Sequence, residues 1–180
     1  MNNYFVILAA GKSKRFHKNI DKQFYNYKNK EIIDHSIIKS LNSKLFKKII
    51  VVTNNLNFFK KKEYVNSIEI IKGGKERSDS SLIALKYLKK YKPKNVYIHD
   101  AARPNFSYKL LQNIAKNLKK NKAVIPAVVA KDSIKYKIKR QIFNLDKNNS
   151  LLTQTPQAFR FNELYNLATK EKNKISDEAT

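Results

Sequence analysis

Residues 4–23 read YFVILAAGKSKRFHKNIDKQ, an apolar run that passes through a glycine into a basic segment. A short continuous apolar run is typical of a strand buried on both faces, as in a parallel sheet. We therefore expect a strand over residues 4–9 and a turn at Gly11. The cations that follow raise the question of which anion this turn holds.

The rest of the chain alternates between strand-like and helix-like segments. This alternation predicts an α/β fold with a Rossmann-like, doubly wound and mostly parallel sheet, in which ligands bind beyond the carboxyl ends of the strands. We expect one compact domain over residues 1–180, because the chain is long enough for one hydrophobic core. The further strands are expected at 48–53, 68–71, 95–99 and 123–129, the last interrupted by Pro126, and the helices at 31–41, 78–91, 109–119 and 162–170.

The segment SIKYKIK at 133–139 departs from this alternation, because its apolar and basic residues alternate strictly. A polar turn and the sequence QIFNL follow it, so a β-hairpin with one apolar and one basic face is predicted. We interpret residues 132–148 as a protruding arm through which a homodimer forms. The alternative is a hairpin at the sheet edge of a monomer.

The net charge of +24 would ordinarily favour a nucleic-acid or membrane partner. The lysines, however, are spread over nearly every segment, so we interpret the charge as compositional bias on solvated faces and expect no specific nucleic acid and no membrane. A basic nucleic-acid-binding module remains the non-enzymatic alternative. The chain has no cysteine, which excludes disulfides, and no apolar run of membrane-spanning length, so a cytoplasmic protein is expected.

Glycine and arginine are rare, and their positions are informative. The three glycines lie in two short basic turns. Three of the five arginines, Arg15, Arg77 and Arg103, follow predicted strands, and the guanidinium fork suits phosphate. Because carboxyl ends of parallel strands share one edge of a sheet, these turns are expected to converge.

The first turn, AAGKSKR, offers backbone N–H groups that a phosphate would accept. A P-loop is excluded because Val6 occupies the position of its first glycine, and a dinucleotide fingerprint is excluded because two glycines are missing. What remains is a phosphate-cradling turn with Arg15 and Lys22, or else a solvated basic loop.

The second and third turns add backbone flexibility and a carboxylate. In GGKERSDSS at 73–81, the glycine pair allows positive φ and close approach, and Ser78 or Asp79 is expected to cap the helix; the alternative is an ordinary helix start. In HDAARP at 99–104, Asp100 is placed to hold Mg²⁺, with a capping role as the alternative. We interpret His99 as an ordinary strand-end histidine. The three turns supply backbone donors, cations and a carboxylate, but no nucleophile paired with a general base. This set of groups suits phosphoryl or nucleotidyl transfer.

The motifs LAAGKSKR, GGKERSDS, IHDAARP, KDSIK, QTPQAF and SDEA occur in order along essentially the whole chain. In this the sequence resembles the bacterial cytidylyltransferases of the non-mevalonate isoprenoid pathway, which make 4-diphosphocytidyl-2-C-methyl-D-erythritol from CTP and 2-C-methyl-D-erythritol 4-phosphate. The related ribitol 5-phosphate cytidylyltransferases, which typically have HDAVRP, are the alternative.

The resemblance implies a role for particular residues and Mg²⁺ as cofactor. The residues are Arg15 and Lys22 as catalytic cations; Ala9, Ala10, Gly11, Gly74, Arg77 and Ser80 at the nucleotide; Asp100 at the metal; and Arg103, Ser133, Lys147, Thr155 and Ser176 at the sugar phosphate. In the family the arm reaches a dimer partner, so Ser133 and Lys147 would serve the partner's site.

The sequence also departs from the family. Asp21 stands where a proline is usual, Ser13 where a glycine is common, and Lys147 replaces an arginine, so a bidentate phosphate contact becomes a point charge. Ser133 and Ser176 replace threonines but keep the hydroxyl. Family members continue into a further strand with a substrate-binding lysine, which implies that this chain is a truncated member or the N-terminal part of a bifunctional cytidylyltransferase/cyclodiphosphate synthase.

Overall fold

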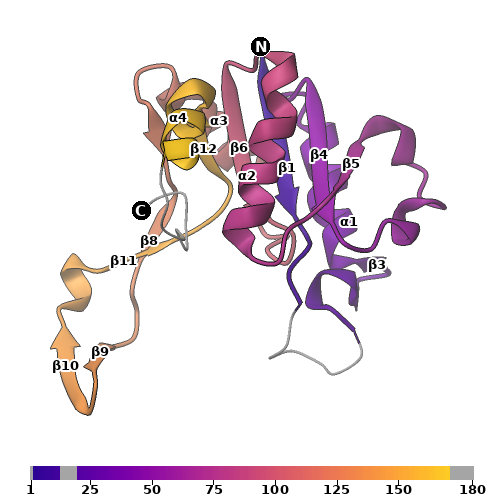
Figure 1. Cartoon of the computed structure of the whole chain (residues 1–180). Coiled ribbons are helices and arrows are strands. Elements are labelled where there is room, and N and C mark those ends of the chain that lie inside the picture. Colours follow the sequence, from indigo (N-terminus) through magenta and orange to yellow (C-terminus); the bar gives the residue numbers. More distant parts are fainter. Residues whose placement is uncertain (1, 13–19, 171–180) are drawn as a thin grey trace.

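The computed structural model describes residues 2–12 and 20–170 and is built around a six-stranded sheet (Figure 1). Four neighbouring strands run parallel, and β12 runs antiparallel to the strands on both of its sides. The mostly parallel sheet is therefore confirmed. In spatial order the strands are β5 (Glu69–Lys72), β4 (Lys48–Thr53), β1 (Asn3–Leu8), β6 (Asn95–Asp100), β12 (Gln157–Arg160) and β7 (Ala123–Val124).

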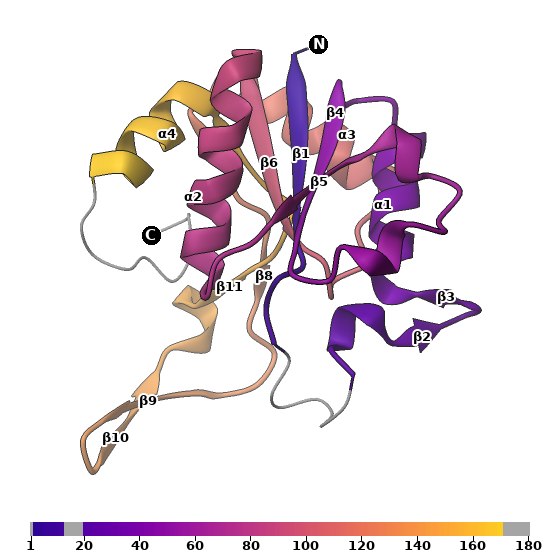
Figure 2. The same cartoon turned by 45° about the vertical axis from the view of Figure 1, so that its right-hand side comes forward.

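Helices cover both faces of this sheet (Figure 2). Alternate residues of β1 point to opposite faces: Phe5 and Ile7 belong to one buried cluster, Tyr4 and Val6 to the other. The first cluster includes residues of α1 (Ile32–Asn42) and α3 (Tyr108–Leu118), and the second includes residues of α2 (Arg77–Leu88) and α4 (Phe161–Lys170). The doubly wound arrangement is thus confirmed, and burial on two faces explains the uninterrupted apolar run of β1.

The strand register sets the first and third turns side by side. In the parallel pairing of β1 with β6, Leu8 is opposite Asp100, and the Ala101 N–H donates to the Leu8 carbonyl at 3.0 Å. The turn that begins at Ala9 therefore leaves the sheet next to the turn that begins at Asp100.

At the far edge of the sheet one prediction is wrong, and one strand had not been predicted. Residues 123–129 do not form one strand, because the chain leaves the sheet before Pro126, which has no N–H for a ladder. Its second half, β8 (Ala127–Val129), pairs instead with β11 (Leu151–Thr153) in a separate two-stranded sheet. The strand between β6 and β7 is β12, which we had not expected as a strand.

The remaining differences are local. The expected helix at 78–91 begins at Arg77, and a 3₁₀ turn, Lys89–Tyr91, extends it. Its N-cap is Glu76 rather than Ser78 or Asp79, and the Glu76 N–H donates to the Asp79 carboxylate at 3.1 Å in a capping box. A short hairpin, β2 (Asn26–Tyr27) and β3 (Lys30–Glu31), precedes α1.

The predicted hairpin is confirmed as an arm that extends away from the six-stranded sheet (Figures 1 and 2). Its strands are β9 (Ile134–Ile138) and β10 (Gln141–Leu145), and a 3₁₀ turn, Lys147–Asn149, leads back from it. Within the described ranges, no helix has both the length and the apolar character needed to cross a membrane.

Candidate active site

The second turn, which follows β5, packs directly against the first turn at Ala10. Gly73 makes this close packing possible because it has no side chain. A Cβ on Gly73 would lie 2.3 Å from the Ala10 Cβ and 3.0 Å from the Ser80 Oγ, so the backbone passes where no other residue fits. The Gly73 N–H donates to the Thr53 carbonyl at 3.2 Å, which ties this turn to the end of β4. The segment that leaves the edge strand β5 is thereby carried across the sheet toward β6.

Gly74 is needed for a similar reason, since its Cβ would lie 2.3 Å from that of Asp79. The Gly74 N–H donates to the Ser80 Oγ at 3.1 Å, and Ser80 is buried. None of the three glycines has positive φ. The prediction of positive φ was therefore wrong and that of close approach was right, while Ser80 supports the turn from beneath it.

Gly11 differs from this pair, because a Cβ there would meet no atom of residues 2–12 and 20–170 within 4 Å. The neighbouring turn is fixed by Gln23, a buried residue whose Nε2 donates to the carbonyls of Ala9 and Gly11, each at 3.0 Å. Lys22, which precedes Gln23, is exposed beside this turn. Gln23 ends the stretch at 4–23, where no pattern in the sequence indicates this role. Arg15 and Ser13 lie outside the described residues.

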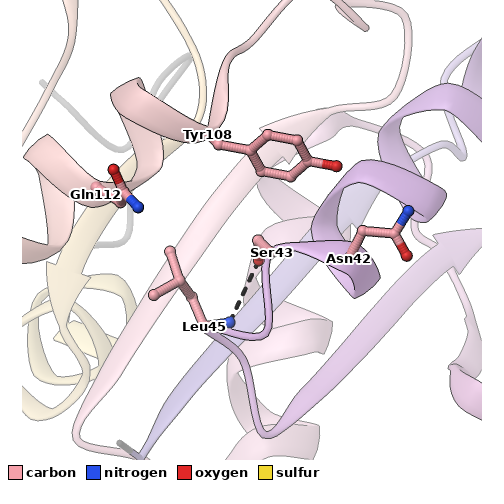
Figure 3. Close-up of a pocket in the computed structure, with 5 residues that line it drawn as sticks. All are labelled: Asn42, Ser43, Leu45, Tyr108 and Gln112. Carbon is pink, nitrogen blue, oxygen red and sulfur yellow. Dashed lines mark hydrogen bonds between the residues drawn. The ribbon is translucent and has the colours of Figure 1, made fainter.

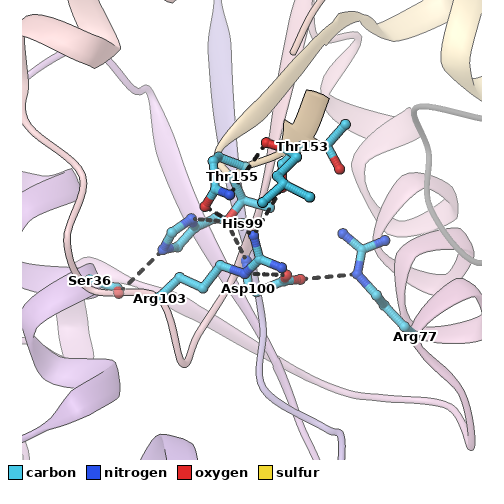
Figure 4. A network of polar contacts seen from close by, with 9 residues as sticks. Ser36, Arg77, His99, Asp100, Arg103, Thr153 and Thr155 are labelled. Carbon is cyan, nitrogen blue, oxygen red and sulfur yellow. Dashed lines mark hydrogen bonds and ion pairs between the residues drawn. The ribbon is translucent and has the colours of Figure 1, made fainter. Parts of the chain in front are cut away.

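Asp100 lies between two arginines at the end of β6 (Figure 4). The Arg77 Nε is 3.0 Å from its Oδ1, and the Arg103 Nε is 3.2 Å from its Oδ2. Arg77 is the first residue of α2, so this ion pair joins the second turn to the third. The second and third turns thus meet at one carboxylate, and the start of the first turn lies next to both of them.

The loop after Asp100 is anchored on both sides. The Arg103 Nη1 donates to the Thr153 carbonyl and to the Gln154 Oε1, both at 3.4 Å. On the other side the Lys39 Nζ donates to the Pro104 carbonyl at 2.9 Å, and partial burial lowers the pKa of Lys39. Arg103 is therefore held at the rim while its side chain stays half exposed.

His99 is fully buried beneath Asp100 and is not a surface group. Burial, with the positive charges of Arg103 and Lys39, lowers the pKa of His99 to about 3, so the ring is neutral at pH 7. Its Nδ1 lies 2.9 Å from the Thr155 Oγ1. Thr155 is buried at the site, next to the Asp100 backbone (Figure 4).

The remaining predicted substrate residues are not gathered here. Ser133 and Lys147 are exposed and lie just before β9 and just after β10, at the base of the arm that extends away from the six-stranded sheet (Figures 1 and 2). Ser176 lies outside the described residues. One chain by itself thus assembles the three turns and Thr155, but not the arm residues.

A cavity of about 230 Å³ lies at the amino-terminal end of the parallel strands, between α3 and the segment that connects α1 to β4 (Figure 3). Uncharged side chains line it: Asn42, Ser43, Leu45, Tyr108 and Gln112. It offers no cation for a phosphate and no carboxylate for a metal. It is therefore separate from the site around Asp100.

The chemistry available at the three turns is anion binding and charge stabilisation. Arg77 and Arg103 flank the Asp100 carboxylate at the end of β6, and the exposed Lys22 follows the glycine turn in the described sequence. In the part of the chain that the structure describes, no group of three or more histidine, cysteine or acidic residues could hold a metal. A divalent ion at Asp100 would therefore take its other ligands from phosphate and water, as Mg²⁺ commonly does.

Comparisons with known proteins agree on one family. Residues 4–180 match the family described as IspD, 2-C-methyl-D-erythritol 4-phosphate cytidylyltransferase. The chain is 46% identical, over 99% of its length, to the "Bifunctional enzyme IspD/IspF" of Pelagibacter ubique, of which it spans 48%. It is 35% identical to the 2-C-methyl-D-erythritol 4-phosphate cytidylyltransferase of Thermosipho melanesiensis and spans 82% of that protein.

A solved structure shows the same fold. The bifunctional IspDF from Campylobacter jejuni is similar with a TM-score of 0.84 and 27% identity, over 98% of this chain and 45% of that one. This chain therefore spans about half the length of the bifunctional proteins that it matches.

Proposed function

The chain belongs to the IspD family of 2-C-methyl-D-erythritol 4-phosphate cytidylyltransferases, and from that premise we propose that it transfers CMP from CTP to 2-C-methyl-D-erythritol 4-phosphate. The products are 4-diphosphocytidyl-2-C-methyl-D-erythritol and pyrophosphate. The observation that carries this proposal is the convergence of an open glycine turn, a second glycine turn and the Arg77–Asp100–Arg103 cluster at one edge of the sheet.

Gly11 supports a ligand at the first turn. Its φ is not positive and a Cβ would meet no protein atom, so nothing in the described structure requires glycine there. In a chain with only three glycines, a glycine that the described residues do not require is consistent with a ligand that approaches the backbone closely. Ala9, Ala10, Gly11 and Gly74 would contact the nucleotide, with Ser80 holding the Gly74 amide in place.

The triphosphate would be held by cations. Lys22 lies beside the glycine turn because Gln23 binds the carbonyls on either side of Ala10, and Arg77 lies at the start of α2. Arg15 is assigned the same task on the basis of the family resemblance alone. These charges would offset the negative charge that builds up around the α-phosphorus in the transition state.

The Asp100 carboxylate is suited to a metal ion whose other ligands would come largely from the bound substrate. Its two oxygens each accept one arginine contact and keep lone pairs free, and its side chain is partly exposed at the rim. Mg²⁺ bound there would neutralise phosphate charge and orient the triphosphate. Asp100 is the residue that would hold it, while Arg77 and Arg103 keep the carboxylate in place.

The reaction needs no covalent enzyme intermediate. A 4-phosphate oxygen of the sugar phosphate attacks the α-phosphorus of CTP in line, a new P–O bond forms, and the bond to the bridging oxygen of the β-phosphate breaks as pyrophosphate leaves. Arg103, half exposed at the rim, would support the sugar phosphate, and Thr155 would support the site from within.

The arm would complete the site of a second copy. Its apolar face consists of side chains that a lone chain leaves in water, among them Tyr136 at 52% exposed, Phe143 at 46% and Leu145 at 45%. A second copy would cover these residues and receive Ser133 and Lys147 at its substrate site. Lys147 would then contact phosphate as a point charge rather than as a fork.

Pyrophosphate release tests the proposal. With CTP, Mg²⁺ and 2-C-methyl-D-erythritol 4-phosphate we expect turnover that falls about 100-fold or more in Lys22→Ala, because a charge at the transition state is lost. Lys116→Ala, an exposed lysine on α3, is the matched control and should keep full activity. Equal turnover with ribitol 5-phosphate would show a different acceptor, and activity unchanged in Lys22→Ala would refute the assigned role of Lys22.

A further inference from the structure

A row of buried polar groups leads from α1 to the backbone of Asp100 (Figure 4). The Ser36 Oγ lies 3.4 Å from the His99 Nε2, and the His99 Nδ1 lies 2.9 Å from the Thr155 Oγ1. The Asp100 N–H in turn donates to that same Thr155 oxygen at 3.4 Å. Ser36 and His99 have no exposed surface, and Thr155 is only 7% exposed.

The strand register explains why a side chain is needed at this point. In the antiparallel pairing of β12 with β6, Gln157 is opposite Ile98, so a ladder continued by two residues would set Thr155 opposite Asp100. Pro156 lies between Thr155 and Gln157 in the sequence and has no N–H for the ladder, and β12 begins only at Gln157. The Thr155 hydroxyl therefore takes the place of a strand partner for the Asp100 amide.

His99 fixes the position of that hydroxyl. Its ring packs against Phe5, with centroids 5.7 Å apart, and against Phe106 at 4.7 Å, both of them buried. A ring so enclosed has little freedom to move, and its Nδ1 contact is the shorter of the two that the Thr155 Oγ1 makes. The threonine rotamer is thus set by a residue of the core.

We propose that His99 is a positioning residue: it holds the Thr155 hydroxyl beneath the Asp100 amide and so fixes the carboxylate at the end of β6. This inference rests on the proposed function of the site. It gives Thr155 a supporting role, since the hydroxyl is bound to two protein groups and the residue has almost no exposed surface. Supporting residues of this kind commonly change metal affinity or activity 10- to 100-fold when they are replaced.

The first test is His99→Phe, which keeps an aromatic ring among Phe5 and Phe106 but removes both nitrogens. We expect kcat for pyrophosphate release to fall about tenfold or more, with the KM for CTP nearly unchanged and a higher Mg²⁺ concentration needed for half-maximal rate. His35→Phe, a histidine on the outer part of α1, is the matched control and should leave all three quantities unchanged. A folded His99→Phe protein with the wild-type kcat and Mg²⁺ dependence would overturn the proposal.

A double variant separates positioning from general damage. Thr155→Val removes both contacts of the hydroxyl, so it should lower kcat at least as much as His99→Phe does, and the two changes together should lower it no further than Thr155→Val alone. Thr155→Ser, which keeps the hydroxyl, should retain most of the activity. Losses that multiply in the double variant would contradict the proposed chain. Should His99→Phe not fold, the Thr155→Val and Thr155→Ser pair decides the matter.

Hydrogen exchange gives a readout that does not depend on turnover. The Asp100 amide should exchange faster in His99→Phe and in Thr155→Val than in the wild type, while the Val96 amide should not change. Unchanged protection of Asp100 would overturn the proposal even for an active enzyme. Absence of pyrophosphate release by the wild type would count against the proposed function alone, and the exchange measurement would still test the position of Thr155.

Discussion

The parallel sheet and the hairpin arm are built from similar residues, yet their side chains are in opposite surroundings. Phe5 and Ile7 of β1 have no exposed surface, whereas Tyr136 and Phe143 of the arm are about half exposed. The difference is that β1 is covered by a helix layer on each face, while the described residues of this chain do not cover the arm. Apolar side chains stabilise a fold only where something covers them, and for the arm we propose a second copy.

The comparison is tested most strongly by removing one aromatic ring from each region. Phe5→Ala should lower the free energy of unfolding by about 3–5 kcal/mol, because it opens a cavity in a packed core. Phe143→Ala should lower it by less than about 0.5 kcal/mol at low protein concentration. Denaturant unfolding measures both. A cost for Phe143→Ala that grows with protein concentration would support coverage by a second copy, and equal costs in the two regions would contradict the comparison.

The glycine turns allow a finer test within the sheet region. Gly73→Ala forces a Cβ against that of Ala10 and should destabilise the fold by about 1–3 kcal/mol. Gly11→Ala has space for its Cβ and should leave stability nearly unchanged while it weakens CTP binding. Thermal unfolding with and without CTP checks both variants. Wild-type CTP affinity in Gly11→Ala would argue against a ligand at the first turn.

The buried His99 predicts a pH dependence that the arm does not share. Its folded pKa is about 3 against an ordinary value of 6.5, so below pH 6.5 the unfolded chain binds a proton that the folded chain does not. Stability is therefore full above pH 6.5 and falls as pH decreases, by at most about 1.4 kcal/mol per pH unit. The pKa values of Glu31 and Glu69 are lowered from 4.5 by bonded lysines, whereas burial raises the pKa of Asp34 from 3.8. The comparison with His99→Phe is therefore what assigns the slope between pH 5 and 6.5 to His99.

The measurement for this prediction is urea unfolding across pH 5–7. In His99→Phe the slope in that window should be nearly flat, while Phe143→Ala should keep the wild-type slope. A wild-type protein whose stability did not change between pH 7 and 5 would contradict the burial of a neutral ring.

The smallest effect on protomer stability is expected for charges on the arm. Tyr136→Lys places a charge on the apolar face and should shift the protein from dimer to monomer in sedimentation. Ile142→Lys is the matched control, since Ile142 is 66% exposed and pairs with Lys137 on the basic face. A dimer that survives Tyr136→Lys, or that Ile142→Lys breaks equally, would exclude the apolar face as the interface.

The sequence predicts the centre of this fold well because burial on two faces leaves a simple pattern. β1 and β4 read as unbroken apolar runs and were expected almost to the residue. β12 is four residues long and follows Pro156, so its segment gave no periodic signal. Its place between β6 and β7 depends on long-range pairing, which local patterns do not encode.

The candidate site also contains residues that the sequence indicated and residues that it did not. The rarity of glycine and arginine in a lysine-rich chain pointed to Gly11, Arg77 and Arg103, and the end of a predicted strand pointed to Asp100; the structure sets the turns that carry them side by side. The supporting residues gave no such signal: Gln23 acts through carbonyls 12 and 14 residues away, and His99 through a threonine 56 residues away. The role of such residues follows from tertiary contacts alone.

The central claim is that the three turns form one site for a cytidine nucleotide, and nucleotide-dependent thermal unfolding tests it most directly. We predict that CTP with Mg²⁺ raises the unfolding midpoint of the wild type more than GTP with Mg²⁺ at equal charge and ionic strength, and that Gly11→Val abolishes the difference without lowering the midpoint of the free protein. Equal stabilisation by both nucleotides, or a CTP effect that persists in Gly11→Val, would contradict the claim.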